Sequence, residues 1–142
     1  MPLMTRATQV VTDRLPKVVT PKTHAVLDYL MAGTCVALGV LFWKNNKRAS
    51  IAAVMCGAAT AANAMLTDYP GGVKKVMSFE THGKIDAGMA GLTATMPTFF
   101  AFRDEPESRY FTTLALVETI ITGLTDFAPS GKVLEMPSHR TA

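Results

Sequence analysis

The chain has 142 residues, of which 49% are hydrophobic and only 18% are charged. Soluble domains usually carry about a quarter of charged residues, so the composition points to lipid or to an alanine-rich bundle. The length is that of a single domain with a core of its own. A formal net charge of +3 without a basic run excludes a typical nucleic-acid-binding surface.

Four apolar segments predict four helices, at residues 24–43, 49–66, 85–102 and 110–124. A helix that crosses a bilayer needs about 20 apolar residues, within a range of about 17–25. The first three segments reach or nearly reach this length, whereas the fourth is short and contains Glu118. We therefore expect an all-α fold, a bundle of four transmembrane helices.

The stretches outside these segments define the domain. Residues 1–20 are expected to form a short amphipathic or irregular segment, because valines alternate there with basic groups. Thr20 before a proline is a typical start of a helix, and Pro97 should kink the third helix. The membrane domain is predicted to span residues 21–135, and residues 136–142 to form a polar tail.

An internal repeat is the clearest pattern in the chain. Many residues recur at an offset of 58 positions without a gap. The matched pairs are His24 and His82, Asp28 and Asp86, Met31 and Met89, Ala32 and Ala90, Gly33 and Gly91, the LTD triplets at 66–68 and 124–126, and Lys74 and Lys132. The repeat predicts two tandem helical hairpins, at residues 21–78 and 79–135.

The repeat also predicts where the ionisable residues meet. In a helical hairpin, the start of the first helix and the end of the second lie at the same end. A histidine and an aspartate four residues apart share one helix face. Six side chains should therefore gather at one end of the bundle. They are His24, Asp28, Asp68, His82, Asp86 and Asp126.

This group of side chains allows three interpretations. Two imidazoles with several carboxylates could bind Zn, Mn or Fe. His24 and His82 could instead be the paired axial ligands of a haem. The third interpretation is structural: the groups form a polar network near the membrane interface, and Asp68 and Asp126 hold turns by accepting backbone hydrogen bonds.

Glu118 is a further candidate because it lies about 12 Å deeper along its helix than Asp126. Its counterpart in the first repeat is Thr60, so the acid is not part of the duplicated pattern. An acid at such a depth is often functional. Alternatively, it is a neutral side chain bonded to Asn63 or to a hydroxyl.

The motifs HAVLDY, LTDYPGGVKKV and F-x-x-H-x-x-x-D resemble those of an uncharacterised bacterial family of small four-helix integral membrane proteins. The resemblance covers residues 21–130. In the second repeat the chain departs from the pattern, since residues 128–131 read APSG where the first repeat has PGGV. The resemblance implies a bacterial membrane fold and no particular activity.

Basic residues predict the orientation in the membrane. Nine lie at the end that holds both termini and five lie in the opposite loops, so both termini should be cytoplasmic in a multi-pass protein of the bacterial inner membrane. No nucleotide-binding, esterase or zinc-protease motif occurs, and we assign no catalytic residue.

The expected function is that of a non-catalytic subunit or scaffold within a larger membrane complex. Its expected partners are the lipid bilayer and other membrane subunits or a second copy of the chain, and no nucleic acid. The alternatives are a metal- or haem-binding redox protein and a small transporter of protons or solutes.

Overall fold

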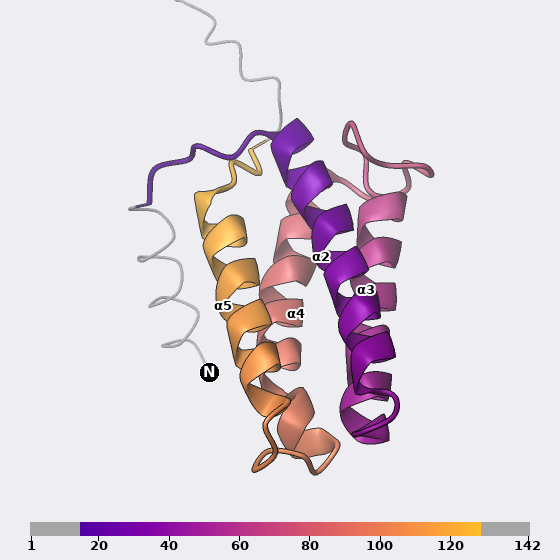
Figure 1. Cartoon of the computed structure of the whole chain (residues 1–142). Helices are drawn as coiled ribbons and strands as arrows, with labels where there is room; N and C mark the ends of the chain where they lie inside the picture. The colour runs from indigo at the N-terminus through magenta and orange to yellow at the C-terminus, as the bar shows by residue number, and fades with distance from the viewer. Residues whose placement is uncertain (1–14, 129–142) are drawn as a thin grey trace, which may run out of the picture.

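A computed structural model describes residues 15–128, which form four helices and no strand (Figure 1). The helices are α2 (Pro21–Phe42), α3 (Lys47–Leu66), α4 (Phe79–Phe99) and α5 (Ser108–Leu124). The predicted all-helical fold is thereby confirmed. Residues 1–14 and 129–142 lie outside the described part, as do the expected tail at 136–142 and the end of the second repeat.

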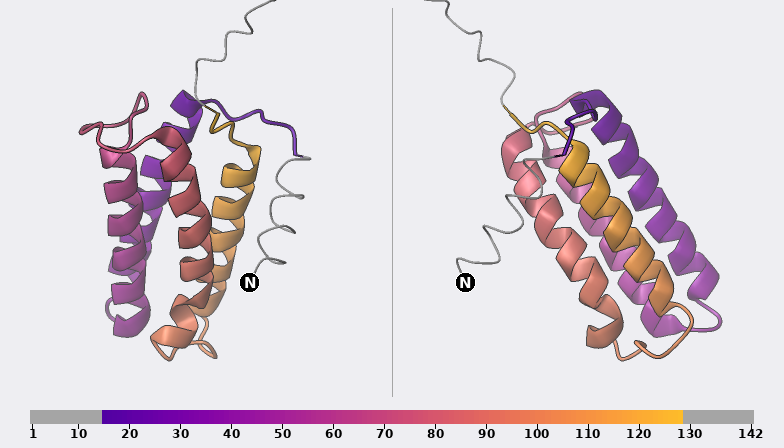
Figure 2. Two further views of the ribbon diagram at one scale, coloured as in Figure 1. Left: turned by 180° about the vertical axis from the view of Figure 1, so that it is seen from behind. Right: turned by 90° about the vertical axis from the view of Figure 1, so that its left-hand side faces the viewer.

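The helices run side by side as two antiparallel hairpins, α2 with α3 and α4 with α5 (Figure 2). The start of α2, the end of α3, the start of α4 and the end of α5 lie at one end of the bundle, which is uppermost in Figure 1. We call it the repeat end. It is the end at which the matched residues of the two repeats were expected to meet.

The duplication is visible in the backbone. The helix starts, Pro21 and Phe79, and the helix ends, Leu66 and Leu124, keep the offset of 58 residues. Both first helices have the same N-cap, in which the side chain of Thr20 or Ser78 accepts from the amide three residues on, at 3.2 Å in each case. Two isolated β-bridges also correspond, Val19 with Thr125 and Met77 with Thr67.

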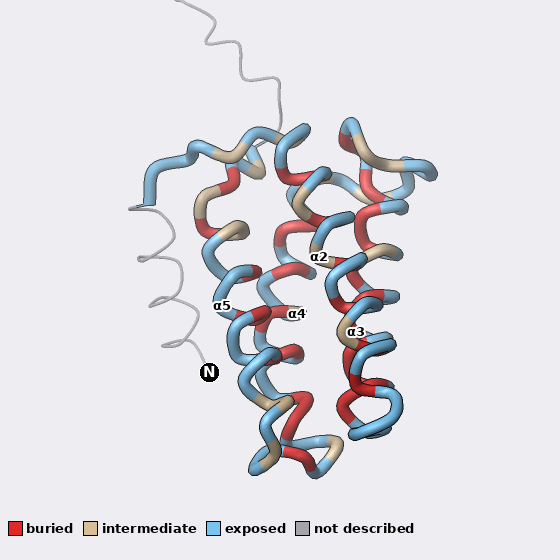
Figure 3. The backbone as a smooth tube through the Cα atoms, in the orientation of Figure 1, coloured by how far each residue is buried: buried red, intermediate tan, exposed pale blue. Residues whose placement is uncertain are grey.

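At the repeat end the interior of the bundle is small and polar, and exposed residues alternate with buried ones along every helix (Figure 3). At the repeat end, the buried side chains are mainly alanine, threonine, histidine and aspartate. Every helix exposes bulky hydrophobic residues. Examples are Leu30 and Val40 on α2, Val54 on α3, Leu92 and Phe99 on α4, and Leu116 and Ile120 on α5.

Two of the four helices, α2 and α3, are long and apolar enough to cross a membrane by length and composition. The start of α4 is too polar, because Glu80, His82, Lys84 and Asp86 fall within its first two turns. The remaining helix, α5, has only 17 residues. The expectation of four spanning helices is thus met by two of them on these criteria.

Helix boundaries differ most from prediction in α4, which starts at Phe79 instead of residue 85. The apolar window overlooked its polar first turns, which follow the N-cap Ser78. Pro97 lies in the last turn, and the chain leaves the helix through Ala101 with a φ of 54°. Of the expected amphipathic segment, residues 15–20 are described and are not helical.

The loops at the opposite end fasten the two hairpins together. Asn46 caps α3 by accepting from the amide of Ala49 at 3.1 Å, and its amide group donates to the carboxylates of Glu105 and Glu107. Arg48 binds the carboxylate of Glu105 and donates to the carbonyl of Ala101 at 2.6 Å. The contacts therefore join the α2–α3 loop region to the α4–α5 loop.

Gly57 provides a test of the packing within the first hairpin. A Cβ at Gly57 would lie 2.9 Å from the carbonyl oxygen of Ala32 and 3.0 Å from Cβ of Cys35. We expect Gly57→Ala to lower the free energy of unfolding by about 1–3 kcal/mol, because α2 and α3 must move apart. Thermal unfolding followed by circular dichroism in detergent measures this effect.

Gly33→Ala is the matched control, because nothing lies within 4 Å of a Cβ at that position. It should be neutral or stabilising by up to about 1 kcal/mol, as expected for glycine to alanine within a helix. Equal effects of the two substitutions would contradict the close contact at Gly57.

Candidate metal centre

Helices α2 and α4 each place a histidine and, one turn later, an aspartate on the buried face of their N-terminal turns. Relative exposure is 1% for His24, 7% for Asp28, 0% for His82 and 5% for Asp86. Four ionisable side chains are thus removed from water at the repeat end. Such burial is costly unless the charges are compensated.

The four side chains converge on a single point. Nε2 of His24 lies 3.1 Å from Nε2 of His82, and Oδ2 of Asp86 lies 3.0 Å and 2.9 Å from these nitrogens. The two carboxylate oxygens of Asp28 each lie 3.3 Å from one of the same nitrogens. One ligand atom from each residue falls within 4.8 Å of all the others. We call these four residues the His/Asp centre.

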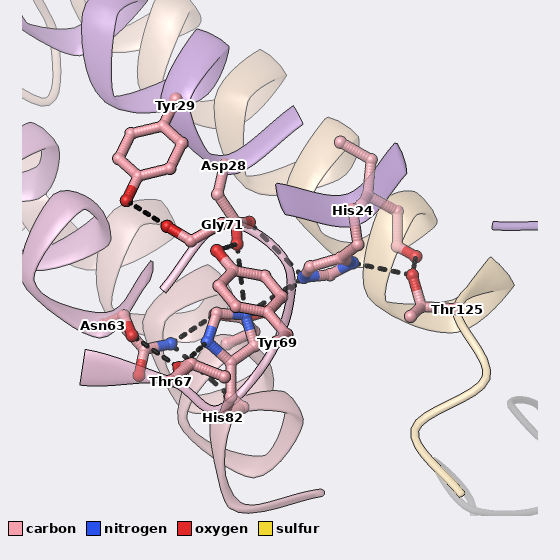
Figure 4. Close-up of polar contacts among 11 residues, drawn as sticks. His24, Asp28, Tyr29, Asn63, Thr67, Tyr69, Gly71, His82 and Thr125 are labelled. Carbon is pink, nitrogen blue, oxygen red and sulfur yellow. Dashed lines mark hydrogen bonds and ion pairs between the residues drawn. The ribbon is translucent and has the colours of Figure 1, made fainter. Parts of the chain in front are cut away.

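Two threonines determine which ring nitrogens of the histidines carry hydrogen. Nδ1 of His24 lies 2.8 Å from the hydroxyl of Thr125, and Nδ1 of His82 lies 2.8 Å from the hydroxyl of Thr67 (Figure 4). Each hydroxyl donates its own hydrogen to the carbonyl one turn earlier in its helix, at 2.6 Å for Thr67 and 2.7 Å for Thr125. Each threonine therefore accepts from Nδ1–H of its histidine.

This pairing has a direct electrostatic consequence. A neutral imidazole that donates through Nδ1 carries a lone pair on Nε2. Both Nε2 atoms then face each other as acceptors, and two carboxylates face them as further acceptors. Four acceptors at these distances repel one another unless a cation, either a metal ion or added protons, lies between them.

Each carboxylate of the centre also accepts a hydrogen bond from a residue outside the centre. The Tyr69 hydroxyl donates to Oδ2 of Asp28 at 2.8 Å, and the Asn63 amide donates to Oδ1 of Asp86 at 2.7 Å. Burial raises the pKa of the Tyr69 phenol above its usual value, and the bond to Asp28 raises it further, so the hydroxyl stays a donor. Hydrogen bonds of this kind orient the ligands in metal sites.

Aromatic rings cover the centre on the side of the repeat end. The ring of His24 packs edge-on against Phe79 and Phe127, with centroids 5.5 Å and 5.2 Å away. The ring of Tyr69 lies 5.3 Å from His82 and stacks on Phe79. These three rings also line the floor of an outer pocket of about 550 Å³, so they separate the centre from that pocket.

The other two predicted aspartates do not join the centre. Asp68 forms an exposed ion pair of 3.1 Å with Lys75, and Asp126 is exposed and accepts from the amide of Ala128 at 3.0 Å. The turn-holding role expected from sequence agrees with the contact of Asp126. Both residues follow the buried threonine of their LTD triplet, and the chain has left the helix at that point.

A haem does not fit between the two histidines. Axial imidazoles on one iron place their coordinating nitrogens about 4 Å apart on opposite faces of the macrocycle. Here the nitrogens are 3.1 Å apart, and the carboxylates of Asp28 and Asp86 lie beside them. The expectation of a haem between His24 and His82 is therefore not supported.

The sequence reasoning missed the residues that position the ligands. Thr67 and Thr125 were recognised only as parts of the repeated LTD triplets, and the chemistry was assigned to the aspartates beside them. The sequence did indicate a role for these threonines, because a threonine beside a predicted helix end recurs at the same offset as the histidines. Asn63 and Tyr69 have no equivalent donor in the second repeat, where Ile121 and Phe127 stand.

The arrangement matches what a small cation requires. A tetrahedral ion with bonds of about 2.0–2.1 Å has ligand atoms about 3.3–3.4 Å apart. Here the contacts that involve a histidine are 2.9–3.3 Å long, and one ligand atom from each residue lies within 4.8 Å of the others. Comparison with protein-family models, with curated proteins and with solved structures finds no match for this chain.

Proposed function

We propose that this chain is a small membrane protein whose bundle binds one divalent transition-metal ion at the His/Asp centre. The observation that carries the proposal is the double threonine contact, which directs Nδ1 of each histidine to a hydroxyl and leaves both Nε2 atoms facing each other between two carboxylates. A divalent cation would balance both carboxylate charges and would use both lone pairs.

The donor set indicates the class of metal. Two imidazole nitrogens and two carboxylate oxygens suit Zn²⁺, Mn²⁺ or Fe²⁺ better than Ca²⁺ or Mg²⁺, which prefer oxygen alone. A set of four protein ligands favours Zn²⁺ among these, because Zn²⁺ is usually four-coordinate. We therefore use Zn²⁺ as the reference ion in the experiments below.

The proposed role of the ion is structural. Sites in which the protein supplies all four ligands are typical of structural metals, whereas catalytic sites keep one position open. The ligands come from the first helix of each hairpin, α2 and α4. The threonines that bind the histidines lie at the C-terminal ends of the second helices, α3 and α5. Metal binding would therefore hold the repeats together, as expected of a non-catalytic scaffold.

The distribution of side chains supports a location in the bilayer. Ionisable residues within a membrane face the interior of a bundle, as the His/Asp centre does. Bulky apolar residues are exposed on all four helices, so the proposal extends to four spanning helices. The excess of basic residues at the repeat end supports cytoplasmic termini in a bacterial inner membrane.

A second candidate role is that of a subunit in a larger membrane assembly. The small residues Ala87, Gly91 and Thr95 lie along the exposed side of α4. Small residues allow close approach of another helix in a membrane. The surface therefore suits contact with a second copy or with another subunit.

Solute transport is less well supported. The half of the bundle farther from the repeat end is filled by apolar side chains, including Phe42, Phe102, Phe111 and Leu114. The buried polar residues nearest the loops of that end are Ser50 and Asn46, and both are bonded within the fold, to the carbonyl of Gly39 and to Glu105. The described conformation therefore has no polar route from one end of the bundle to the other.

Metal binding is the first prediction of this proposal. The purified protein should bind one Zn²⁺ per chain, measured by elemental analysis and calorimetric titration, and Zn²⁺ should raise its melting temperature. His24→Ala and His82→Ala should each weaken binding by more than about 100-fold. Loss of a residue that only orients a metal ligand already costs about 10–100-fold in affinity.

Asp68→Asn is the matched control, since it removes an exposed carboxylate at the same end and should leave Zn²⁺ binding unchanged. Under the purely structural interpretation, both histidines are protonated and pair with the aspartates. Zn²⁺ would then neither bind nor change the melting temperature, and that result would exclude a metal centre.

The second prediction concerns the threonines that accept from the histidines. Thr67→Ala and Thr125→Ala should each weaken Zn²⁺ binding about 10–100-fold, because the imidazole loses the partner that fixes its tautomer. Serine at either position keeps the hydroxyl and should restore most of the affinity. Calorimetric titration of the folded variants provides the measurement.

Thr113→Ala is the control for this series. Thr113 also donates to the carbonyl one turn earlier, at 3.0 Å, but lies exposed on α5, and its loss should not change the affinity. If the alanine variants at positions 67 and 125 bind as tightly as the wild type, the threonines do not position the ligands.

The third prediction concerns membrane topology. Cysteines introduced as Asn45→Cys and Lys74→Cys lie in loops at opposite ends, and native Cys35 and Cys56 are buried. An impermeant thiol reagent should label position 45 in spheroplasts and position 74 only after permeabilisation. The wild-type protein should stay unlabelled and serves as the blank.

Two outcomes would correct the proposal in different ways. Labelling of position 74 alone before permeabilisation would reverse the orientation. Absence of labelling at both positions before permeabilisation, together with recovery of the protein in the soluble fraction, would show that the bundle does not lie in a membrane.

A further inference from the structure

A second polar layer lies deeper in the bundle, below the His/Asp centre. It consists of two pairs related by the repeat, Cys35 with Thr93 and Thr60 with Glu118, and all four residues are buried. Cys35 and Thr93 follow Asp28 and Asp86 by seven residues, which is about 10 Å along a helix. We call these four residues the Glu118 layer.

Only small side chains separate the two layers along the first helices of the repeats. Ala32 and Ala90 occupy the intervening buried positions on α2 and α4. On α3, Asn63 lies three residues from Thr60 and donates to Asp86. Its carbonyl oxygen Oδ1 is buried and has no hydrogen-bond partner within residues 15–128. Between the layers, α2 and α4 therefore contribute only alanine at their buried positions, and α3 contributes a buried acceptor.

Within the described residues 15–128, Glu118 has no positively charged partner. Its carboxylate lies 3.4 Å from the hydroxyl of Thr93, which in turn lies 3.8 Å from Sγ of Cys56. Among residues 15–128, no lysine, arginine or histidine forms an ion pair with it.

The titratable groups packed around Glu118 are acidic or neutral. They are Asp28 and Cys35 from α2, Cys56 from α3, and Asp86 from α4, while α5 carries Glu118 itself. Burial among such groups disfavours a negative charge. We infer that Glu118 holds a proton when no metal is bound.

The repeat shows that the fold does not need an acid at this position. Thr60, the counterpart of Glu118, donates to the carbonyl of Cys56 at 3.0 Å within its own helix. A hydroxyl therefore satisfies the same site in the first hairpin without help from other helices. The acid in the second hairpin adds a titratable group that packing alone does not explain.

We propose that Glu118 is a proton-binding site linked to the metal site, and that it releases its proton when the His/Asp centre binds a divalent cation. This inference rests on the proposed metal binding. The positive charge of the ion, about 10 Å away by helix geometry, favours the ionised carboxylate. The O–H bond of Glu118 breaks, the proton is released to the bulk solvent, and no electrons are transferred.

The linkage works in both directions. If metal binding releases a proton from Glu118, protonation of Glu118 must weaken metal binding by the same factor. The Glu118 layer would thereby make metal affinity sensitive to pH beyond the effect of the ligands themselves. The chemical class of the effector at this second site is the proton alone.

The experiment compares wild type with Glu118→Gln, which keeps the shape and removes the titratable group. Calorimetric Zn²⁺ titrations in two buffers of different ionisation enthalpy give the number of protons released per ion, and melting curves confirm folding. We expect the wild type to release up to one proton more. Where Glu118 titrates, wild-type affinity should rise up to tenfold more per pH unit than that of the variant.

A double variant uses the repeat as an internal control. Glu118→Thr combined with Thr60→Glu moves the acid to the position related by the repeat and should restore the additional proton. Equal proton release by wild type and Glu118→Gln overturns the role of Glu118 while leaving metal binding intact. Failure of the wild type to bind Zn²⁺ overturns both proposals, so the two failures are distinguishable.

Discussion

The hydrogen bonds from Nδ1 of the two histidines to Thr67 and Thr125 are the interactions on which the rest of the site depends. They fix the direction of both rings, so that Nε2 of each neutral imidazole is an acceptor aimed at the centre. The carboxylates of Asp28 and Asp86 then turn a pair of acceptors into a site with two negative charges. Neutralising these two negative charges requires a positive charge at the centre.

Gene duplication offers a simple physical route to such a site. A single hairpin supplies one histidine, one aspartate and one threonine, which cannot enclose an ion. Two hairpins related by the repeat supply four ligands, and each histidine contacts a threonine at the end of the other hairpin's second helix. The symmetry is incomplete where function can differ: Tyr69 corresponds to Phe127, Asn63 to Ile121, and Thr60 to Glu118.

Much of the architecture follows from the sequence because the repeat is a long-range constraint that can be read without a structure. The offset of 58 residues predicted which helix ends meet, and with them the neighbourhood of His24 and His82. Propensity and hydropathy were less informative at α4, whose first turns are polar because they carry the ligands. The same polarity keeps α4 below the usual threshold for a spanning helix.

Spacing along the sequence could not by itself predict which of the aspartates join the His/Asp centre. Asp28 and Asp86 lie within helices, where the direction of a side chain follows from its position in the turn. Asp68 and Asp126 lie just beyond helix ends, where backbone angles decide the direction, and both point to solvent. The threonines before them point inward for the same reason, and a pattern of residue types does not contain that information.

The separation in sequence between each histidine and its threonine determines when the site can be assembled during synthesis. Thr67 and His82 are 15 residues apart, so the second histidine can meet its acceptor as soon as α4 forms. Thr125 and His24 are separated by 101 residues, and closing such a long loop is slow and entropically costly. His24 can therefore meet its threonine only after α5 has left the ribosome.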